Sequence, residues 1–344
     1  MAQHWFIVPP VNGPLSGGTL YNRELLRELS SLGLAVGALE PPAALEALEA
    51  GVAGVYWVDS LFLSHFAAFR QANRQLRPLG LLAHYLPSLV DKSDDVTPED
   101  LSPDEAFALA RADVTLAPSD YMKRTLDRLG LAAKARCLVV EPGCPAPGVV
   151  AGAVGVVGVR AVLVANLTPG KGVEPFLRAL AAELRDDDEL RLEIVGRLDV
   201  DAAYTQACFE AVQQHPKLAR RVTFSGALTP AGVTERLRSS NLLVSASRME
   251  SFGMAIAEAR TLGLPVLALA RGNVPALVEP AAGGVLASTD GALARACVEL
   301  ARDPATRRRN LALARSHPRP PRSFAEAARD FVAQLSTIDL VDRA

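Results

Sequence analysis

Short apolar runs alternate with longer amphipathic segments along most of the chain. His4–Val8, Leu79–Ala83 and Leu242–Val244 are short and largely apolar, as is typical of strands buried on both faces of a sheet. Between such runs, leucines or alanines recur at three- and four-residue spacing, for example in a helix expected from about Thr19 to Gly33. The alternation predicts an α/β fold built on parallel sheets.

The alternation is interrupted once. A glycine- and valine-rich stretch, residues 149–159, is too short to span a membrane and is interpreted as an interdomain connection, after which strands and helices restart at Arg160. We therefore expect two doubly wound, Rossmann-like domains, residues 1–150 and 151–322. The proline-rich segment HPRPPR ends the helical pattern of the second domain, and an amphipathic helix is expected after it, over Phe324–Leu335.

Composition narrows the class of protein. The 344 residues are 49% hydrophobic and 22% charged, which suits a two-domain globular protein, and a net charge of -2 predicts no nucleic-acid partner. The four cysteines form no CxxC pair, and the N-terminus lacks a signal-peptide pattern, so a cytoplasmic location is expected. Peripheral contact with the inner face of a membrane stays open. Arg70, Arg74 and Arg77 form either a basic stripe for such a contact or an ordinary solvated face.

The stretch from Asn241 to Glu279 holds the most informative pattern. It predicts a strand at Leu242–Val244, a polar loop, a helix opened by Gly253, and a second strand at Pro265–Leu269. Such a βαβ unit belongs to a parallel sheet, in which ligands bind at the carboxyl ends of the strands.

Two carboxylates frame this helix start. Glu250 and Glu258 are separated by roughly 12 Å at helical rise, a span that suits a diphosphate with a sugar at one end and a ribose at the other. Between them, the backbone N–H groups of Phe252, Gly253 and Met254 favour an anion. A sugar nucleotide fits this pattern. The alternative is a surface glutamate followed by an ordinary helix residue.

ESFGMAIAE at Glu250–Glu258, followed by GLPVLA, resembles the E-x7-E motif of retaining GT-B glycosyltransferases of the family 4 type. Further matching pieces occur in the family's order: SGG at 16–18, His84 after an apolar run, PSDYMKRTL from Pro118, EPG at 141–143 and TPGKG at 168–172. The resemblance implies a GT-B fold, two Rossmann-like domains facing across a cleft. Residues 1–150 would take the acceptor, with a C-terminal helix (323–344) packed back on them, and residues 151–322 would bind the nucleotide sugar.

The resemblance also implies roles for individual residues. Its expected catalytic residues are His84, Lys171 and Glu250. The expected donor-binding residues are Gly17, Gly18, Asn166, Lys171, Arg197, Gly226, Leu228, Glu250, Ser251, Phe252, Gly253, Met254 and Glu258. Without it, Lys171 would be interpreted as a solvated lysine and the two early glycines as a tight strand-to-helix turn.

One position departs from the family pattern. Five residues before Lys171 the family commonly has an arginine, whereas this chain has Asn166. An asparagine lacks the positive charge of the guanidinium and its paired N–H donors, which bind a phosphate in bidentate fashion. Arg197 or Arg248 could supply the missing charge. The acidic run Asp186–Asp188 lies between a helix and a strand and is interpreted as a solvated turn, so no metal site is assigned.

The sequence thus favours a retaining hexosyltransferase that uses a nucleoside diphosphate sugar, preferably a UDP-sugar, as co-substrate, with no other cofactor and no metal. The acceptor, a saccharide, a lipid or a small molecule, is left open, as are the sugar and the oligomeric state. The alternatives are an epimerase or a phosphorylase on the same fold, or a two-domain protein that binds a sugar without chemistry.

Overall fold

The chain divides into two units, each with its own sheet. The computed structural model describes residues 3–10, 12–13, 16–74, 76–92, 95–129, 136–144 and 158–338. Unit 1 comprises Met1–Gly143 and Arg322–Ala344, and unit 2 comprises Cys144–Pro321. Residues 149–157 of the expected interdomain connection lie outside the described residues.

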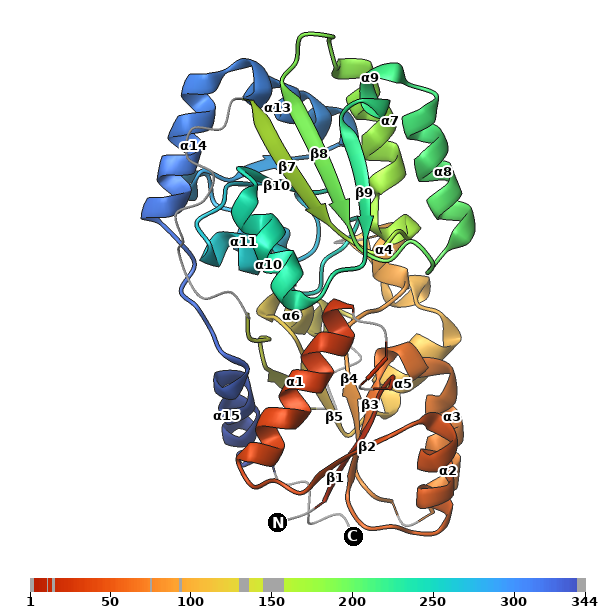
Figure 1. Ribbon diagram of the computed structural model, residues 1–344. Coiled ribbons are helices and arrows are strands. Elements are labelled where there is room, and N and C mark those ends of the chain that lie inside the picture. Colours follow the sequence, from red (N-terminus) through yellow and green to blue (C-terminus); the bar gives the residue numbers. More distant parts are fainter. Residues whose placement is uncertain are drawn as a thin grey trace. The chain divides into compact units, whose positions relative to one another are not determined.

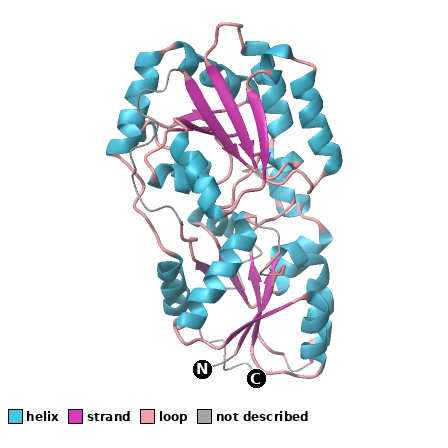
Figure 2. Ribbon diagram, viewed as in Figure 1, coloured by secondary structure: helices cyan, strands magenta, loops and turns pink. Residues whose placement is uncertain are grey.

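Unit 1 contains a six-stranded parallel sheet (Figures 1 and 2). Its strands are β1 (His4–Ile7), β2 (Val36–Leu39), β3 (Val55–Asp59), β4 (Leu79–Leu82), β5 (Val114–Ala117) and β6 (Arg136–Val139). The strand order is β2-β1-β3-β4-β5-β6. Every residue of β3, β4 and β5 is buried, as expected when helices cover both faces of a sheet. The order reverses at β1 and β3, and the carboxyl edge there is where such folds bind ligands.

The helices of unit 1 include one from the C-terminal segment. They are α1 (Gly17–Ser31), α2 (Pro41–Glu49), α3 (Leu63–Ala72), α4 (Ser88–Lys92), α5 (Pro103–Arg111), α6 (Asp120–Arg128) and α15 (Phe324–Leu335), with 3-10 turns η1 (Ser60–Phe62) and η3 (Pro98–Asp100). Helix α15 lies beside α1 (Figure 1). Phe331 of α15 is fully buried, with its ring centroid 5.2 Å from that of Trp57, and Gln334 exchanges two hydrogen bonds with the Val139 backbone. These contacts make α15 part of the core of unit 1.

Unit 2 is also built on a six-stranded parallel sheet. Its strands are β7 (Val159–Val164), β8 (Leu190–Val195), β9 (Val222–Gly226), β10 (Leu242–Ser245), β11 (Val266–Leu269) and β12 (Val285–Ala287). Their order, β12-β11-β10-β7-β8-β9, is that of a doubly wound nucleotide-binding sheet. The chain runs outward from β7 in one direction and from β10 in the other, so its switch point lies between these two strands. The predicted fold class, α/β with two doubly wound sheets, is confirmed.

Helices cover both faces of this second sheet. They are α7 (Val173–Glu183), α8 (Ala202–Gln213), α9 (Pro216–Ala219), α10 (Pro230–Ser239), α11 (Met254–Thr261), α12 (Val274–Leu277), α13 (Asp290–Arg302) and α14 (Pro304–Ser316), with 3-10 turns η5 (Pro169–Lys171) and η6 (Pro280–Ala282). Strand residues alternate between two cores: Leu242 and Val244 pack with α7, α8 and α13, whereas Leu243 packs with α10, α11 and α12. This period of two places both faces of β10 in apolar surroundings.

Two expectations for unit 1 are corrected. Helix α1 begins at Gly17 rather than at Thr19, because Ser16 caps it: Ser16 Oγ accepts from the Thr19 N–H, and Thr19 Oγ1 accepts from the Ser16 N–H. The three arginines do not share one helix, since α3 ends at Ala72 and only Arg70 lies on it. Arg70 makes an ion pair with Asp113.

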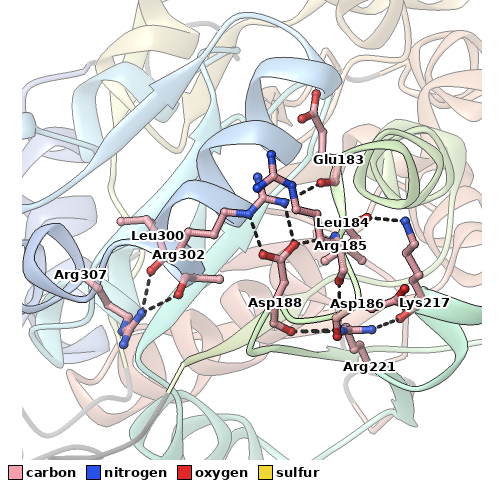
Figure 3. A network of polar contacts seen from close by, with 11 residues as sticks. Glu183, Leu184, Arg185, Asp186, Asp188, Lys217, Arg221, Leu300, Arg302 and Arg307 are labelled. Carbon is pink, nitrogen blue, oxygen red and sulfur yellow. Dashed lines mark hydrogen bonds and ion pairs between the residues drawn. The ribbon is translucent and has the colours of Figure 1, made fainter.

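The acidic run Asp186–Asp188 is only partly a solvated turn. Asp186 is exposed, but the Asp188 side chain is 2% exposed and is held by Arg302 at 2.6 Å (Figure 3). Burial alone would raise the pKa of Asp188, but hydrogen bonds from Arg302 and from the Arg185 N–H hold it below its usual value. The residues that the structure describes contain no cluster of acidic, histidine or cysteine side chains fit for a metal.

Candidate functional site

The carboxyl edge of the unit 2 sheet gathers several of the expected donor-binding residues. After β7 comes Asn166, whose Oδ1 accepts a 3.0 Å hydrogen bond from the backbone N–H of Arg197, the second residue after β8. Gly196 N–H in turn donates to Gly226 O at the end of β9. Neighbouring strand ends are therefore tied together by short polar contacts, which fix the positions of these residues at this edge.

Lys171 and Glu250 meet at the switch point of this sheet. Lys171 ends the turn η5 after β7, and Glu250 lies in the loop after β10. Their side chains form an ion pair of 2.7 Å, with 33% and 17% of the respective side chains exposed. A second bond, from the Arg248 N–H to Gly170 O (2.9 Å), joins the same two loops. Two residues that are 79 positions apart are thus held side by side.

The loop that carries Glu250 is clamped from the loop after β11. The Asn273 N–H donates to Glu250 O, and Asn273 Nδ2 donates to Phe252 O, both at 2.8 Å. Gly272 has a φ of 60°, and a Cβ there would lie 2.5 Å from Glu250 O, so only glycine fits this approach. These contacts fix the backbone of the Glu250 loop.

Helix α11 begins directly after this loop. Gly253 is its N-cap residue, with a φ of 96° and no side chain to cap the helix. The first N–H groups of an α-helix have no intrahelical partner, and its N-terminus carries partial positive charge. An anion such as a phosphate would be stabilised at this position.

Glu258 lies one turn further along α11 and is 6% exposed. Burial raises its pKa to about 7. Within the described residues its carboxyl group has no hydrogen-bond or ion-pair partner. An unpaired buried carboxyl is costly, and a ligand with hydroxyl donors would satisfy it.

The other expected cations are already paired. Arg197 Nε lies 2.9 Å from Asp199 Oδ1, and Arg248 lies 2.9 Å from Asp290 Oδ2. Either arginine would have to leave its carboxylate, or hold it while contacting a phosphate, to replace the charge missing at Asn166.

The remaining donor-side residues are placed as follows. Gly226 has a φ of 70° with open space where a Cβ would lie, and Leu228 packs on the core beneath α10. Ser251 and Met254 are half-buried. Phe252 is buried, with the Arg319 guanidinium 5.4 Å from its ring centroid.

In unit 1, His84 follows β4 at the carboxyl edge of the sheet. Its Nε2 lies 2.7 Å from Asn22 Oδ1, and the Tyr21 ring packs at right angles, 4.8 Å between centroids. Burial lowers the pKa of His84, and the negative charge of Asp59 opposes that shift.

Gly17 and Gly18 form the first turn of α1, and a Cβ on Gly18 would meet no described atom within 4 Å. The fold of unit 1 itself thus places no steric demand on Gly18.

Four residues of these sites were missed in the sequence: Asn22, Asp59, Gly272 and Asn273. Asp59 had a visible signal, a carboxylate directly after the apolar run VYWV. The other three depend on contacts between distant segments.

Part of the chain matches a known protein family. Residues 158–303 match the model of the family described as Glycosyl transferases group 1. A D-inositol 3-phosphate glycosyltransferase from Kribbella flavida is 31% identical over 237 residues, which are 64% of this chain and 55% of the relative. The relative from Nocardia farcinica is 28% identical over 246 residues, 67% of this chain and 53% of that protein. The chain spans about half the length of the curated relatives it matches.

Solved structures share the fold over nearly the whole chain. Sucrose-phosphate synthase from Thermosynechococcus elongatus has a TM-score of 0.75 at 18% identity, covering 97% of this chain and 98% of that one. The Anabaena protein Alr3699/HepE, in complex with UDP and glucose, has a TM-score of 0.75 at 17% identity, covering 98% and 100%. The chain has the GT-B fold of these structures. Within this GT-B chain, unit 2 carries the match to group 1. No helix in the described ranges is long and apolar enough to cross a bilayer.

Proposed function

We propose that this GT-B chain transfers a hexose from a nucleoside diphosphate sugar, preferably a UDP-sugar, to an acceptor hydroxyl with retention of anomeric configuration. The observation that carries the proposal is the grouping, along one loop and helix, of the Lys171–Glu250 pair, the uncapped start of α11, and Glu258, whose carboxyl has no polar partner among the described residues. A cation, helix N–H groups and two carboxylates match, in order, the parts of a sugar nucleotide.

Each group has a defined task in this proposal. Glu250 accepts hydrogen bonds from sugar hydroxyls, Lys171 and the N–H groups near Gly253 hold the diphosphate, and Glu258 accepts from the ribose hydroxyls. Backbone atoms near Gly226 and Leu228 contact the base. In unit 1, His84 hydrogen-bonds a substrate hydroxyl, and unit 1 holds the acceptor.

Catalysis is mainly electrostatic in this scheme. The bond from the anomeric carbon to the leaving phosphate oxygen breaks, and the acceptor oxygen bonds to that carbon on the same face. The leaving phosphate takes the acceptor proton. Negative charge grows on the diphosphate, and a positioned donor such as Lys171 contributes about 3 kcal/mol of transition-state stabilisation. Because Lys171 supplies positive charge at the phosphates, we propose that no metal is required.

The names of similar proteins support the donor and suggest one acceptor class. The curated relatives are named as D-inositol 3-phosphate glycosyltransferases, and the Anabaena protein was solved with UDP-glucose. We therefore include inositol phosphates among the first acceptors to be screened, beside saccharides and lipid acceptors. An epimerase or phosphorylase on the same fold, and a binding protein without chemistry, are the competing functions.

The test is an acceptor screen with UDP-, GDP- and ADP-sugars, with and without a chelator. Transfer to a hydroxyl acceptor with an unchanged anomeric configuration by NMR, unaffected by the chelator, supports the proposal. Sugar isomerisation with the nucleotide still attached would indicate an epimerase, and formation of a sugar 1-phosphate would indicate a phosphorylase. Tight donor binding without any turnover would favour a binding protein.

A further inference from the structure

Three polar side chains from separate elements of unit 1 form a buried chain of hydrogen bonds. Asn22 lies on α1, Asp59 ends β3, and His84 follows β4. Asn22 Nδ2 lies 2.6 Å from Asp59 Oδ2, and Asn22 Oδ1 lies 2.7 Å from His84 Nε2. All three are at most 8% exposed, and they lie at the carboxyl edge of the sheet beside the switch point of β1 and β3.

The direction of these bonds is set by Asp59. Its Oδ1 accepts a 2.9 Å hydrogen bond from the Leu61 N–H, and its other oxygen faces Asn22. An ionised carboxylate only accepts hydrogen bonds, so Asn22 must present its NH₂ group to Asp59. The amide oxygen of Asn22 then faces His84.

An amide oxygen cannot donate, so His84 Nε2 must carry the proton. A neutral imidazole has one N–H, which leaves a lone pair on Nδ1. Burial favours this neutral form of His84. The perpendicular Tyr21 ring, itself anchored by a 2.9 Å bond from its hydroxyl to Val140 O, packs against the imidazole. Among the described residues, His84 Nδ1 has no hydrogen-bond partner.

We propose that Asn22 and Asp59 are positioning residues that hold His84 in its Nε2–H tautomer, so that Nδ1 accepts a hydrogen bond from a substrate hydroxyl. The hydroxyl as ligand rests on the proposed transferase function, whereas the tautomer depends only on this hydrogen-bond chain. His84 acts here as an acceptor, and it does not act as a cation or as a proton donor toward the substrate.

The decisive variant is Asp59→Asn. Its side-chain oxygen keeps the bond from the Leu61 N–H, so its new NH₂ group faces Asn22. Asn22 then turns its amide and presents NH₂ to His84 Nε2, which must accept. The imidazole is driven to the Nδ1–H tautomer, as a change of hydrogen-bond partner requires. Asn22→Ala removes the bridge and should give a mixture of tautomers.

Nitrogen NMR of the imidazole ring reads the tautomer without any substrate. The His84 signals are assigned by their loss in His84→Gln. Asp113→Asn is the matched control, because Asp113 accepts from the Leu79 N–H (2.8 Å) and from Arg70 (2.9 Å) at the opposite end of β4. It should leave the His84 spectrum unchanged.

The wild type should show a protonated Nε2 and an unprotonated Nδ1 at neutral pH. The pattern should reverse in Asp59→Asn, with a fall in kcat of about tenfold, the size expected for one lost hydrogen bond. A wild-type Nδ1–H or imidazolium spectrum, or an unchanged Nε2–H tautomer in both variants, would overturn the proposal. If neither variant folds, the wild-type spectrum decides alone. The predicted tautomers in a protein without transferase activity would refute only the proposed function.

Discussion

Lys171 Nζ donates a 2.7 Å hydrogen bond to Glu250 Oε1, so the cation expected to hold the diphosphate is paired with the carboxylate expected to hold the sugar. A donor that binds here must replace this contact with its own phosphate and hydroxyl groups. The pair keeps both long side chains ordered, which lowers the entropy that binding would otherwise cost.

Changing either member of the pair should have opposite effects on product binding. Lys171→Ala should lower turnover about 100-fold and weaken UDP binding, since a positioned donor to the leaving group is lost. Glu250→Gln frees Lys171 for the phosphates and should tighten UDP binding, while slowing transfer because a charged acceptor for the sugar hydroxyls is lost. Initial rates and UDP titrations measure both effects.

Arg295→Ala is the control for these variants. Arg295 is an exposed cation of α13 paired with Glu183 at 3.4 Å, and its loss should change neither quantity. Wild-type rates and UDP affinity in Lys171→Ala would remove Lys171 from the site.

The Glu258 carboxyl should make stability depend on pH. Its pKa is raised by burial to about 7 from 4.5, so the folded protein binds more protons than the unfolded chain between these values. Stability from this group is therefore present at low pH and is lost as pH rises toward 7. Relative to Glu258→Gln, the wild type should lose about 2 to 3 kcal/mol of unfolding free energy between pH 5 and pH 8.

Donor binding should show the opposite trend. Ribose hydroxyls are best accepted by the ionised carboxylate, so UDP-glucose affinity should rise from pH 6 to pH 8 in the wild type and stay flat in Glu258→Gln. Denaturant titrations and calorimetry at the same pH values test both trends. Parallel curves for the two proteins would show that Glu258 does not titrate in this range.

Asn166→Arg tests whether the phosphate clamp lacks one charge. UDP affinity should rise about tenfold if the new guanidinium reaches the diphosphate. The Arg197 N–H loses its acceptor, Asn166 Oδ1, which should cost about 1 kcal/mol of stability. Asn166→Ala carries the same cost without the charge, and affinity equal to that of Asn166→Arg would refute the missing-charge hypothesis.

The Asp188–Arg302 pair is expected to stabilise unit 2 without affecting catalysis. Asp188 precedes β8, at the sheet edge opposite the strand ends that carry the site. Asp188→Asn should lower the free energy of unfolding by about 2 kcal/mol, the size expected for lost hydrogen bonds between charged groups, because the Arg302 side chain left behind is 31% exposed; kcat should be unchanged.

Asp186→Asn is the matched control, because its side chain is 78% exposed and its 3.5 Å contact with Arg220 is open to solvent. Equal stability of the two variants in denaturant titrations would contradict the assigned role of Asp188.

The fold was predictable where hydrophobic periodicity is strong. β10, α11 and β11 were expected within a residue or two, because an apolar strand, a glycine and an alanine-rich helix follow one another closely. β2 was missed: it is a four-residue edge strand whose residues are only half-buried or exposed, so its composition carries little signal. The α1 start was placed late because its cap uses Thr19 in place of the usual acidic residue.

The candidate site was predictable only as a list of residues along the chain. The pairing of Lys171 with Glu250 crosses 79 positions, and that of Asp188 with Arg302 crosses 114. Such contacts are fixed by the order of strands in the sheet, which local patterns do not specify. For the same reason, no local sequence pattern around Asn22 predicts that its side-chain amide bridges Asp59 and His84.

The central claim is that unit 2 binds a nucleoside diphosphate between Glu250 and Glu258, at the N-terminus of α11. Titration calorimetry with UDP, GDP and ADP tests it most directly. We predict that UDP binds most tightly, and that Lys171→Ala and Glu258→Gln each weaken its binding while Arg295→Ala leaves it unchanged. No measurable binding of any of the three, or equal binding by all four proteins, would contradict the claim.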